Sequence, residues 1–187
     1  METQTKFLGF VIDENGIKPD LDKVTTIRAM TRPSSAKEVR GFLGMCGYYR
    51  RFIPHYSEKA LPLTELTGKY KNFQWTDKCE QSFNTLKTDL TVIPYLAHPD
   101  PKLSYILWTD ASDSCVGAVL TQASPHRSDS DTDETSAPFD RPIVFLSHKL
   151  SPTQTRWSTV EKELLRIQFA PRKLDYYLHN AQFEIRT

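Results

Sequence analysis

Apolar residues in the first half of the chain recur every three or four positions, which is the spacing of one face of a helix. Four segments share this pattern and are predicted to be helices: 19–30, 35–53, 57–66 and 76–90. A short strand is predicted over 7–12, and the turn after it ends at Gly16, which can adopt a positive φ. The first half therefore predicts a mainly helical unit.

Serine and glutamate mark the starts of two predicted helices. Ser35 with Glu38, and Ser158 with Glu161, have the spacing of a capping box, in which each side chain accepts a hydrogen bond from a backbone N–H. This spacing predicts that helices begin directly after Ser35 and Ser158.

After Leu103 the apolar pattern changes to that of β-strands. Four segments are predicted to be strands: 105–109, 116–121, 143–147 and 183–187. The stretch 124–142 is polar and acidic, which predicts a long exposed loop. The helix after Ser158 is expected to turn four apolar side chains inward: Val160, Leu164, Ile167 and Phe169.

Pro171 interrupts that helical pattern. A proline inside a helix costs about 3 kcal/mol or more because it lacks the N–H and clashes with the preceding turn. The helix is therefore expected to end near Ala170 and restart, or this copy of the sequence has drifted.

Composition limits the class of protein. Hydrophobic residues make up 39% and aromatic residues 11% of the chain, which favours a globular protein over a disordered one. No apolar run approaches the roughly 18 residues of a membrane span, and the N-terminus lacks a signal-peptide pattern. We expect a cytoplasmic or nuclear protein with no membrane partner. Cys46, Cys79 and Cys115 are far apart, so reduced core cysteines are expected.

The net charge of +1 conceals an uneven distribution. Up to Lys71 the chain has 12 Lys and Arg against 8 Asp and Glu, and the remainder has 12 against 15. The basic first half favours a phosphate backbone as partner.

Asp110 follows an apolar strand directly, at a place where core packing does not explain a carboxylate. Glu161 and Glu163 lie in the first turns of the helix that begins some fifty residues later. Carboxylates suit hard cations such as Mg²⁺, and two such ions about 4 Å apart can stabilise both sides of a phosphodiester during displacement. The pattern predicts a metal-dependent nuclease. The alternative is that Glu161 and Glu163 are solvated surface residues that bind no metal.

Long stretches resemble the Pol polyprotein of gypsy-type LTR retrotransposons. The RNase H domain of that family is similar to ILWTDASDSCVGAVLTQ and RPIVFLSHKLSPTQTRWSTVEKELLRI. The segment after its polymerase active site is similar to KFLGFVIDENGIKPDLDKV, and its thumb to EVRGFLGMCGYYRRFIPHYSEKALPLTEL. The connection of the family is similar to FQWTDKCEQSFNTLKTDLTVIPYLAHPD, so the resemblance covers nearly the whole chain.

The resemblance implies an α+β or α/β fold with a helical thumb and connection, followed by a partial RNase H-like mixed sheet with a helix. It implies four regions: the end of the palm at 1–18, the thumb at 19–68, the connection at 69–102, and the truncated RNase H-like domain at 103–187.

Site residues follow from the same resemblance. Asp110 matches the first metal-binding Asp, Glu163 matches the helix Glu that bridges the metals, and Glu161 matches a non-catalytic position. The implied cofactor of the complete domain is Mg²⁺, with Mn²⁺ as a substitute, and the implied substrate is an RNA:DNA hybrid.

Nucleic-acid contacts are expected in the first half, where the Phe-Leu-Gly strand of the family helps to hold the primer. Gly41, Gly44 and Gly47 recur every three residues, although each weakens a helix by about 1 kcal/mol. A helix face without side chains, as these glycines would form, suits close packing against another helix or against a duplex. Both interpretations remain open. The arginines could contact phosphates or form a solvated face. The expected contact residues are Phe7, Leu8, Gly9, Lys37, Arg40, Gly41, Gly44, Tyr48, Arg50 and Arg51.

Two parts of the family pattern lie outside this sequence: the Tyr-x-Asp-Asp type polymerase motif upstream, and the third metal-binding Asp just after Thr187. We therefore expect no polymerase activity and no useful nuclease activity from this chain alone. Expected partners are an RNA:DNA hybrid or template-primer duplex, the rest of the Pol polyprotein, and another copy through an open sheet edge. Alternatives are a non-catalytic binding module and a drifted retroelement relic.

Overall fold

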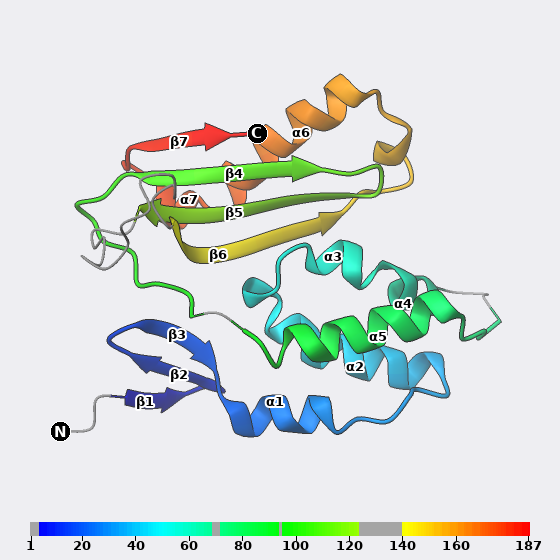
Figure 1. Ribbon diagram of the computed structural model, residues 1–187. Helices are drawn as coiled ribbons and strands as arrows, with labels where there is room; N and C mark the ends of the chain where they lie inside the picture. The colour runs from blue at the N-terminus through cyan, green and yellow to red at the C-terminus, as the bar shows by residue number, and fades with distance from the viewer. Residues whose placement is uncertain (1–3, 69–71, 94, 124–139) are drawn as a thin grey trace, which may run out of the picture.

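The computed structural model describes residues 4–68, 72–93, 95–123 and 140–187 (Figure 1). A first part combines helices with a three-stranded sheet, and a second part has a four-stranded sheet with helices against it. Most of the loop predicted over 124–142 lies outside the described residues, and its last residues already belong to a strand.

The first part runs from the N-terminal hairpins to the last helix before the connector. Its elements in order are β1 (Gln4–Phe7), β2 (Phe10–Asp13), β3 (Gly16–Pro19), α1 (Leu21–Arg28), α2 (Ala36–Tyr48), the 3-10 turn η1 (Arg50–Phe52), α3 (Tyr56–Lys59), α4 (Leu61–Leu66) and α5 (Asp77–Asp89).

Two predictions for this part are wrong in detail. The single strand predicted over 7–12 is two antiparallel strands, because the chain reverses at Leu8 and Gly9. The helix predicted over 57–66 is divided at Ala60. Pro62 has no N–H with which to continue the preceding helix, so α4 begins as a new helix with proline in its first turn.

One hydrophobic cluster holds the first part together. Val39, Phe42 and Cys46 on one face of α2 are fully buried against the neighbouring helices. The rings of Phe42 and Phe83 lie 4.6 Å apart between centroids, which joins α2 to α5. Burial raises the pKa of the Cys46 thiol to about 12, so this cysteine stays protonated at neutral pH, in keeping with a reduced core residue.

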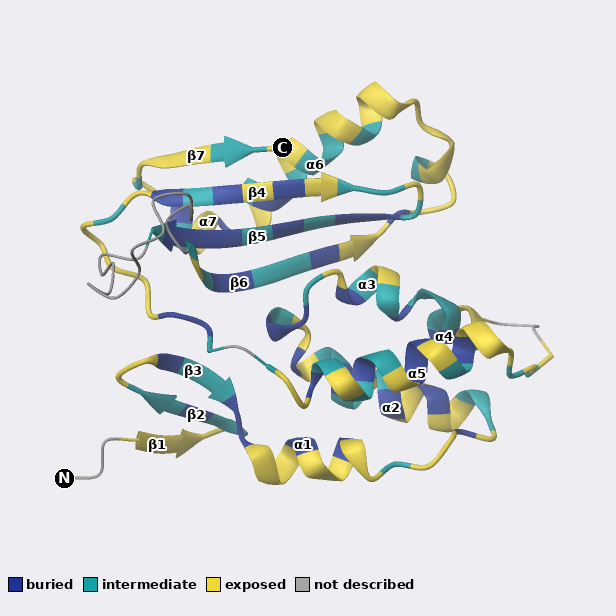
Figure 2. Cartoon of the chain, viewed as in Figure 1, coloured by how far each residue is buried: buried dark blue, intermediate teal, exposed yellow. Residues whose placement is uncertain are grey.

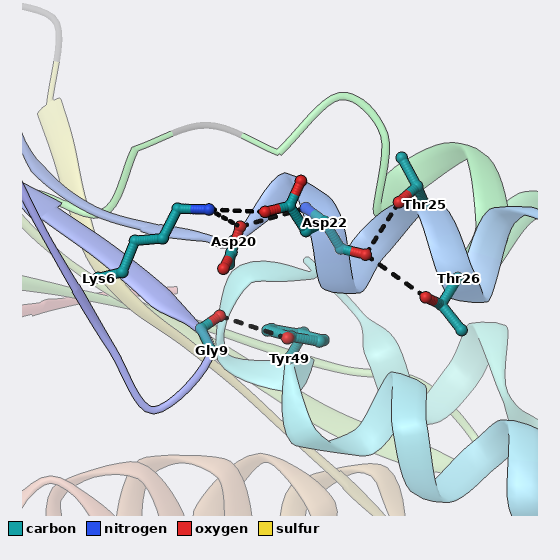
Figure 3. Close-up of polar contacts among 7 residues, drawn as sticks. All are labelled: Lys6, Gly9, Asp20, Asp22, Thr25, Thr26 and Tyr49. Carbon is teal, nitrogen blue, oxygen red and sulfur yellow. Dashed lines mark hydrogen bonds and ion pairs between the residues drawn. The ribbon is translucent and has the colours of Figure 1, made fainter.

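Polar contacts fix the first hairpin on the helices (Figure 3). Lys6 Nζ lies 3.1 Å from Asp20 Oδ1 and 2.6 Å from Asp22 Oδ2, and Asp20 also caps α1. The hydroxyl of Tyr49 donates to the Gly9 carbonyl over 3.3 Å. The hydrogen bond from Lys6 lowers the pKa of the Asp20 carboxyl below its ordinary value of 3.8.

The second part confirms the predicted mixed sheet. Its elements are β4 (Tyr105–Ala111), β5 (Cys115–Ala123), β6 (Asp140–Lys149), η2 (Gln154–Arg156), α6 (Thr159–Lys173), α7 (Asp175–Leu178) and β7 (Phe183–Arg186). The strand order is β6-β5-β4-β7, with β7 parallel to β4 and the other pairs antiparallel.

The inward face predicted for α6 is wrong for three of its four residues. Val160 is 67% and Leu164 61% exposed, and Ile167 is exposed too, so the start of the helix is open to solvent (Figure 2). Phe169 packs against the sheet-facing cluster as predicted, next to the fully buried Ala170. Lys162 is largely buried, and its Nζ contacts Asp113 Oδ1 at 2.9 Å.

Pro171 does not end α6. The helix continues to Lys173, and the N–H of Leu174 donates to the carbonyls of Ala170 and Pro171. A new short helix then begins at Asp175, so the restart expected from the sequence occurs, but one turn later than Ala170.

The two parts meet at β6, which lies above α3 in Figure 1. The Ser57 N–H donates to Ser147 Oγ over 2.9 Å, and the Arg50 guanidinium donates to the Ser147 carbonyl. The predicted open edge is thus partly covered on the β6 side, while β7 forms the other edge of the sheet. Across the described residues, no helix is both long and apolar enough to traverse a bilayer.

The orientation of α6 predicts different costs for two leucine deletions. Leu107→Ala should lower the free energy of unfolding by about 2–5 kcal/mol, because Leu107 is fully buried. Leu164→Ala should change it by no more than about 0.5 kcal/mol, because that side chain faces solvent. Urea titration of both variants measures the difference. Equal losses would show that the outer face of α6 is packed.

The ion pair at Lys6 predicts a pH-dependent stability. Asp20 is more acidic in the folded state, so its contribution is fully present above its unfolded pKa and is lost as pH falls through the lower folded value. Asp20→Asn keeps a capping side chain but removes the charge. The stability advantage of the wild type over this variant should shrink in urea titrations as pH falls below the ordinary value of 3.8. Glu65→Gln, at an exposed position of α4, is the control. An advantage that stays constant with pH would contradict the role of this ion pair.

Candidate nucleic-acid interface and acidic site

The exposed face of α2 gathers five of the residues expected to contact nucleic acid. They share one stripe of the helix, opposite the buried face: Lys37, Arg40, Gly41, Gly44 and Tyr48. A Cβ added at Gly41 or Gly44 would meet nothing within 4 Å in the described structure. At Gly47, in contrast, it would lie 3.4 Å from the Tyr56 hydroxyl. Within the described chain, Gly41 and Gly44 are therefore not used for helix packing.

The β1–β2 turn projects beside this stripe. Leu8 has a φ of 47° and Gly9 a φ of 77°, as a tight hairpin turn requires, although a leucine in this conformation is strained. The Leu8 side chain is 69% exposed, and its neighbour Phe7 is exposed too. The Tyr48 hydroxyl donates to the Leu8 carbonyl, so the turn is fixed to the end of α2.

Lys6, Asp20 and Tyr49 support this arrangement, and the sequence analysis missed the contacts through which they do so. Each acts through a contact between residues more than a dozen positions apart. The spacing of residues along the chain contains no signal for such contacts. Tyr48 was identified, and its ring stacks on Phe10 with centroids 5.2 Å apart.

Arg50 and Arg51 lie apart from the α2 stripe. Arg50 contacts Ser147 and lies over the Tyr56 ring, 5.5 Å from its centroid. Arg51 Nη2 donates to the Tyr177 hydroxyl over 3.1 Å. Both arginines therefore point from η1 toward the second part.

Asp110 is the next-to-last residue of β4, where it pairs with Gly117, and its side chain lies on the sheet face that the first part covers. Leu107 on the same strand joins the cluster beneath α6, and the alternation of a strand turns Asp110 to the opposite face. There it lines a recess of about 10 Å³ with His55 and Glu58, which is about the room that one water needs. A wider groove beside it is lined by Asp110, Trp108 and Thr187.

Glu163 lies on α6, on the other side of the sheet. Its carboxylate is half exposed and its Oε1 lies 3.7 Å from Arg166 Nη2. Glu161 completes the predicted capping box with Ser158, and the Ser158 backbone N–H lowers the pKa of its carboxyl. Lys162 links α6 to the β4–β5 turn, so Asp110 and Glu163 lie at the same end of the sheet but on opposite faces.

The residues described do not fit a complete metal site. No group of three or more His, Cys, Asp or Glu side chains in the described ranges is placed to hold an ion. Asp110 and Glu163 supply two carboxylates, and neither of the recesses that Asp110 lines includes Glu163. A hard cation requires more oxygen ligands than these two side chains provide.

Comparison with known proteins identifies the family to which residues 75–185 belong. A family model described as an RNase H-like domain found in reverse transcriptase matches residues 75–185. The retrovirus-related Pol polyprotein from transposon opus of Drosophila melanogaster is 38% identical over 192 residues, which covers 97% of this chain and 18% of that protein. The transposon Tf2-3 polyprotein of Schizosaccharomyces pombe is 34% identical, over 100% of this chain and 13% of its own length.

Solved structures share the fold. The foamy viral protease-reverse transcriptase in complex with RNA/DNA hybrid has a TM-score of 0.77 and 22% sequence identity, over 98% of this chain and 23% of that chain. The same enzyme in complex with dsDNA also has a TM-score of 0.77, over 99% of this chain and 36% of that chain. The chain belongs to the family of RNase H-like domains found in reverse transcriptase, and it spans less than a fifth of the length of the transposon polyproteins that it resembles.

Proposed function

We propose that this chain binds an RNA:DNA hybrid or template-primer duplex through the exposed face of α2 and the β1–β2 turn. The observation that carries the proposal is the bare backbone at Gly41 and Gly44, where the described structure has no neighbour within 4 Å. Glycine weakens a helix, so two exposed glycines on one stripe need a reason outside the folded chain. Close approach to another backbone supplies that reason.

The side chains around the glycines suit a duplex. Lys37 and Arg40 flank the bare strip and would contact phosphates, which gives affinity that depends on salt but not on sequence. Phe7, Leu8 and Tyr48 offer apolar surface for sugars or bases at one end of the strip. The foamy viral enzyme of the same fold was solved with RNA/DNA hybrid and with dsDNA, which supports this class of ligand.

The division of the chain follows the same proposal. Residues 1–18 would end the palm, 19–68 form the thumb, 69–102 the connection, and 103–187 the RNase H-like domain. Two separate core clusters support two main parts, since the first includes Leu96 and the second begins at Ala97.

In the longer polyprotein, Asp110 and Glu163 would be metal ligands for hydrolysis of the RNA strand. Mg²⁺, or Mn²⁺ in its place, would supply charge stabilisation at the phosphodiester. β7 runs parallel to β4 with Arg186 beside Trp108, and Thr187 lines the same groove as Asp110. An acidic residue following Thr187, as the family pattern has it, would come next to Asp110.

A non-catalytic binding module is the second candidate function. The incomplete carboxylate set among the described residues favours it for the chain taken alone. Binding would then use the basic residues that the sequence analysis identified: Lys37, Arg40, Arg50 and Arg51.

Gly44→Leu separates binding from folding. Leucine is a better helix former than glycine and meets no neighbour here, so the free energy of unfolding should rise by about 0.5–1 kcal/mol. Hybrid affinity should fall by about tenfold or more, because the side chain occupies the space where a duplex would approach. Urea titration and fluorescence anisotropy on a labelled hybrid measure the two effects.

Gln81→Leu is the matched control, since it adds the same side chain at an exposed position of α5. It should leave hybrid affinity unchanged. Unaltered affinity in Gly44→Leu would exclude α2 as the binding face.

The chain alone should not cleave a hybrid. We expect no cleavage of a labelled RNA strand with Mg²⁺ or Mn²⁺, because two carboxylates do not complete the ligand set. Asp110→Asn should bind the hybrid as tightly as the wild type. If the wild type cleaves RNA and Asp110→Asn does not, two carboxylates suffice and this expectation is wrong.

A further inference from the structure

A basic groove of about 460 Å³ lies where the two parts of the chain meet. Its walls come from η1, the second half of β6, the end of α6, and α7. Three of its lining residues are cationic, Arg50, Arg51 and Lys173, and the His148 imidazole lies among them. None of the described residues that line the groove is Asp or Glu.

The positive charge in the groove is only partly compensated. Arg51 donates one hydrogen bond to the Tyr177 hydroxyl, but its Nε is buried and has no partner among the described residues. A neutral hydroxyl does not balance a guanidinium charge. Cationic side chains gathered in a partly buried groove without a carboxylate are stabilised by an anion.

The remaining lining of the groove is flat and apolar. The Phe169 ring stacks on His148 with centroids 5.4 Å apart, and the Tyr177 ring lies on the same wall. Aromatic faces next to guanidinium groups suit sugars and bases as well as phosphates. This lining fits a nucleic-acid strand better than an isolated inorganic anion.

The groove and the stripe on α2 are close in the chain. The stripe ends at Tyr48, and η1, which supplies Arg50 and Arg51 to the groove, begins two residues later. Through these arginines η1 contacts β6 and α7. The two basic surfaces are therefore successive along the chain.

We propose that this groove binds the sugar-phosphate backbone of one strand of the duplex as it passes from the first part to the second. The proposal rests on the proposed function, because it assumes the same duplex. It assigns binding roles to Lys173, His148 and the two arginines, and makes Phe169 and Tyr177 the apolar wall. Binding at this point would hold the duplex in a defined position relative to both parts of the chain.

Lys173 offers the cleanest test. Its side chain is exposed in the last turn of α6, and the described structure shows no hydrogen bond or ion pair for it, so Lys173→Gln should leave the fold intact. Arg172 is the adjacent exposed cation on the same helix and does not line the groove. Arg172→Gln therefore removes the same charge with no expected contact.

The experiment measures hybrid affinity over a range of salt concentrations for four proteins: the wild type, Lys37→Gln, Lys173→Gln and Arg172→Gln. Each lost phosphate contact should reduce the slope of log K against log salt by about 1. We expect this loss, with an affinity about threefold lower at low salt, for Lys37→Gln and Lys173→Gln but not for Arg172→Gln. On the shortest duplex that binds, Lys37→Gln should still weaken binding, whereas Lys173→Gln should not.

The outcomes separate the two proposals. If Lys173→Gln behaves like Arg172→Gln while Lys37→Gln and Gly44→Leu weaken binding, the proposed binding site in the groove is wrong and the α2 interface is supported. If only Lys173→Gln weakens binding, the groove is supported as a binding site and the proposed α2 interface is wrong. If the wild type does not bind hybrid, both proposals fail.

Discussion

The contact of Ser147 with η1 and α3 is the constraint on which the arrangement of the two parts of the chain depends. One buried serine supplies both a hydroxyl to the Ser57 N–H and a carbonyl to the Arg50 guanidinium. These bonds occupy polar groups along β6 that would otherwise face solvent or another chain. They also bring η1, the edge of the sheet and the end of α6 around one groove. Each proposed contact with nucleic acid is placed relative to the others through this junction.

α2 shows how one helix serves both the core and a surface. Its buried face is apolar and continuous, so packing against α4 and α5 holds the helix in place. That burial makes two glycines tolerable on the opposite face, where they would weaken an isolated helix. The exposed stripe thus has little side-chain bulk at its centre and basic groups at its margin. Such a surface suits a long, uniformly charged partner better than a small molecule.

Local signals predicted most elements of the fold. Capping at Ser35 and Ser158, together with apolar spacing, located the three longest helices, and all strands of the second part appear close to their predicted positions. The failures have specific causes. The Leu8–Gly9 turn was missed because leucine rarely adopts a positive φ, and only the tertiary bond from Tyr48 reveals why it does so here.

The orientation of α6 and the site could be predicted only in part. Its apolar stripe indicated one face, but most of that stripe is exposed, and the helix buries much of the side chains of Lys162 and Arg166 instead. The glycine stripe on α2 was located from spacing, but its solvent exposure depends on where other helices pack. The groove beside Lys173 could not be predicted, because its walls are far apart in the sequence and meet through the tertiary contacts of Arg50 and Arg51.

The parallel pairing of β4 with β7 has a consequence for how the chain folds. The first core cluster is complete once Leu96 has been made, and its helices depend mostly on neighbours near in sequence. β4, in contrast, must wait for Phe183 to find its parallel neighbour, and closing so long a loop is slow. During synthesis from the N-terminus, the helical part therefore folds first and offers η1 and α3 as a template on which the sheet assembles.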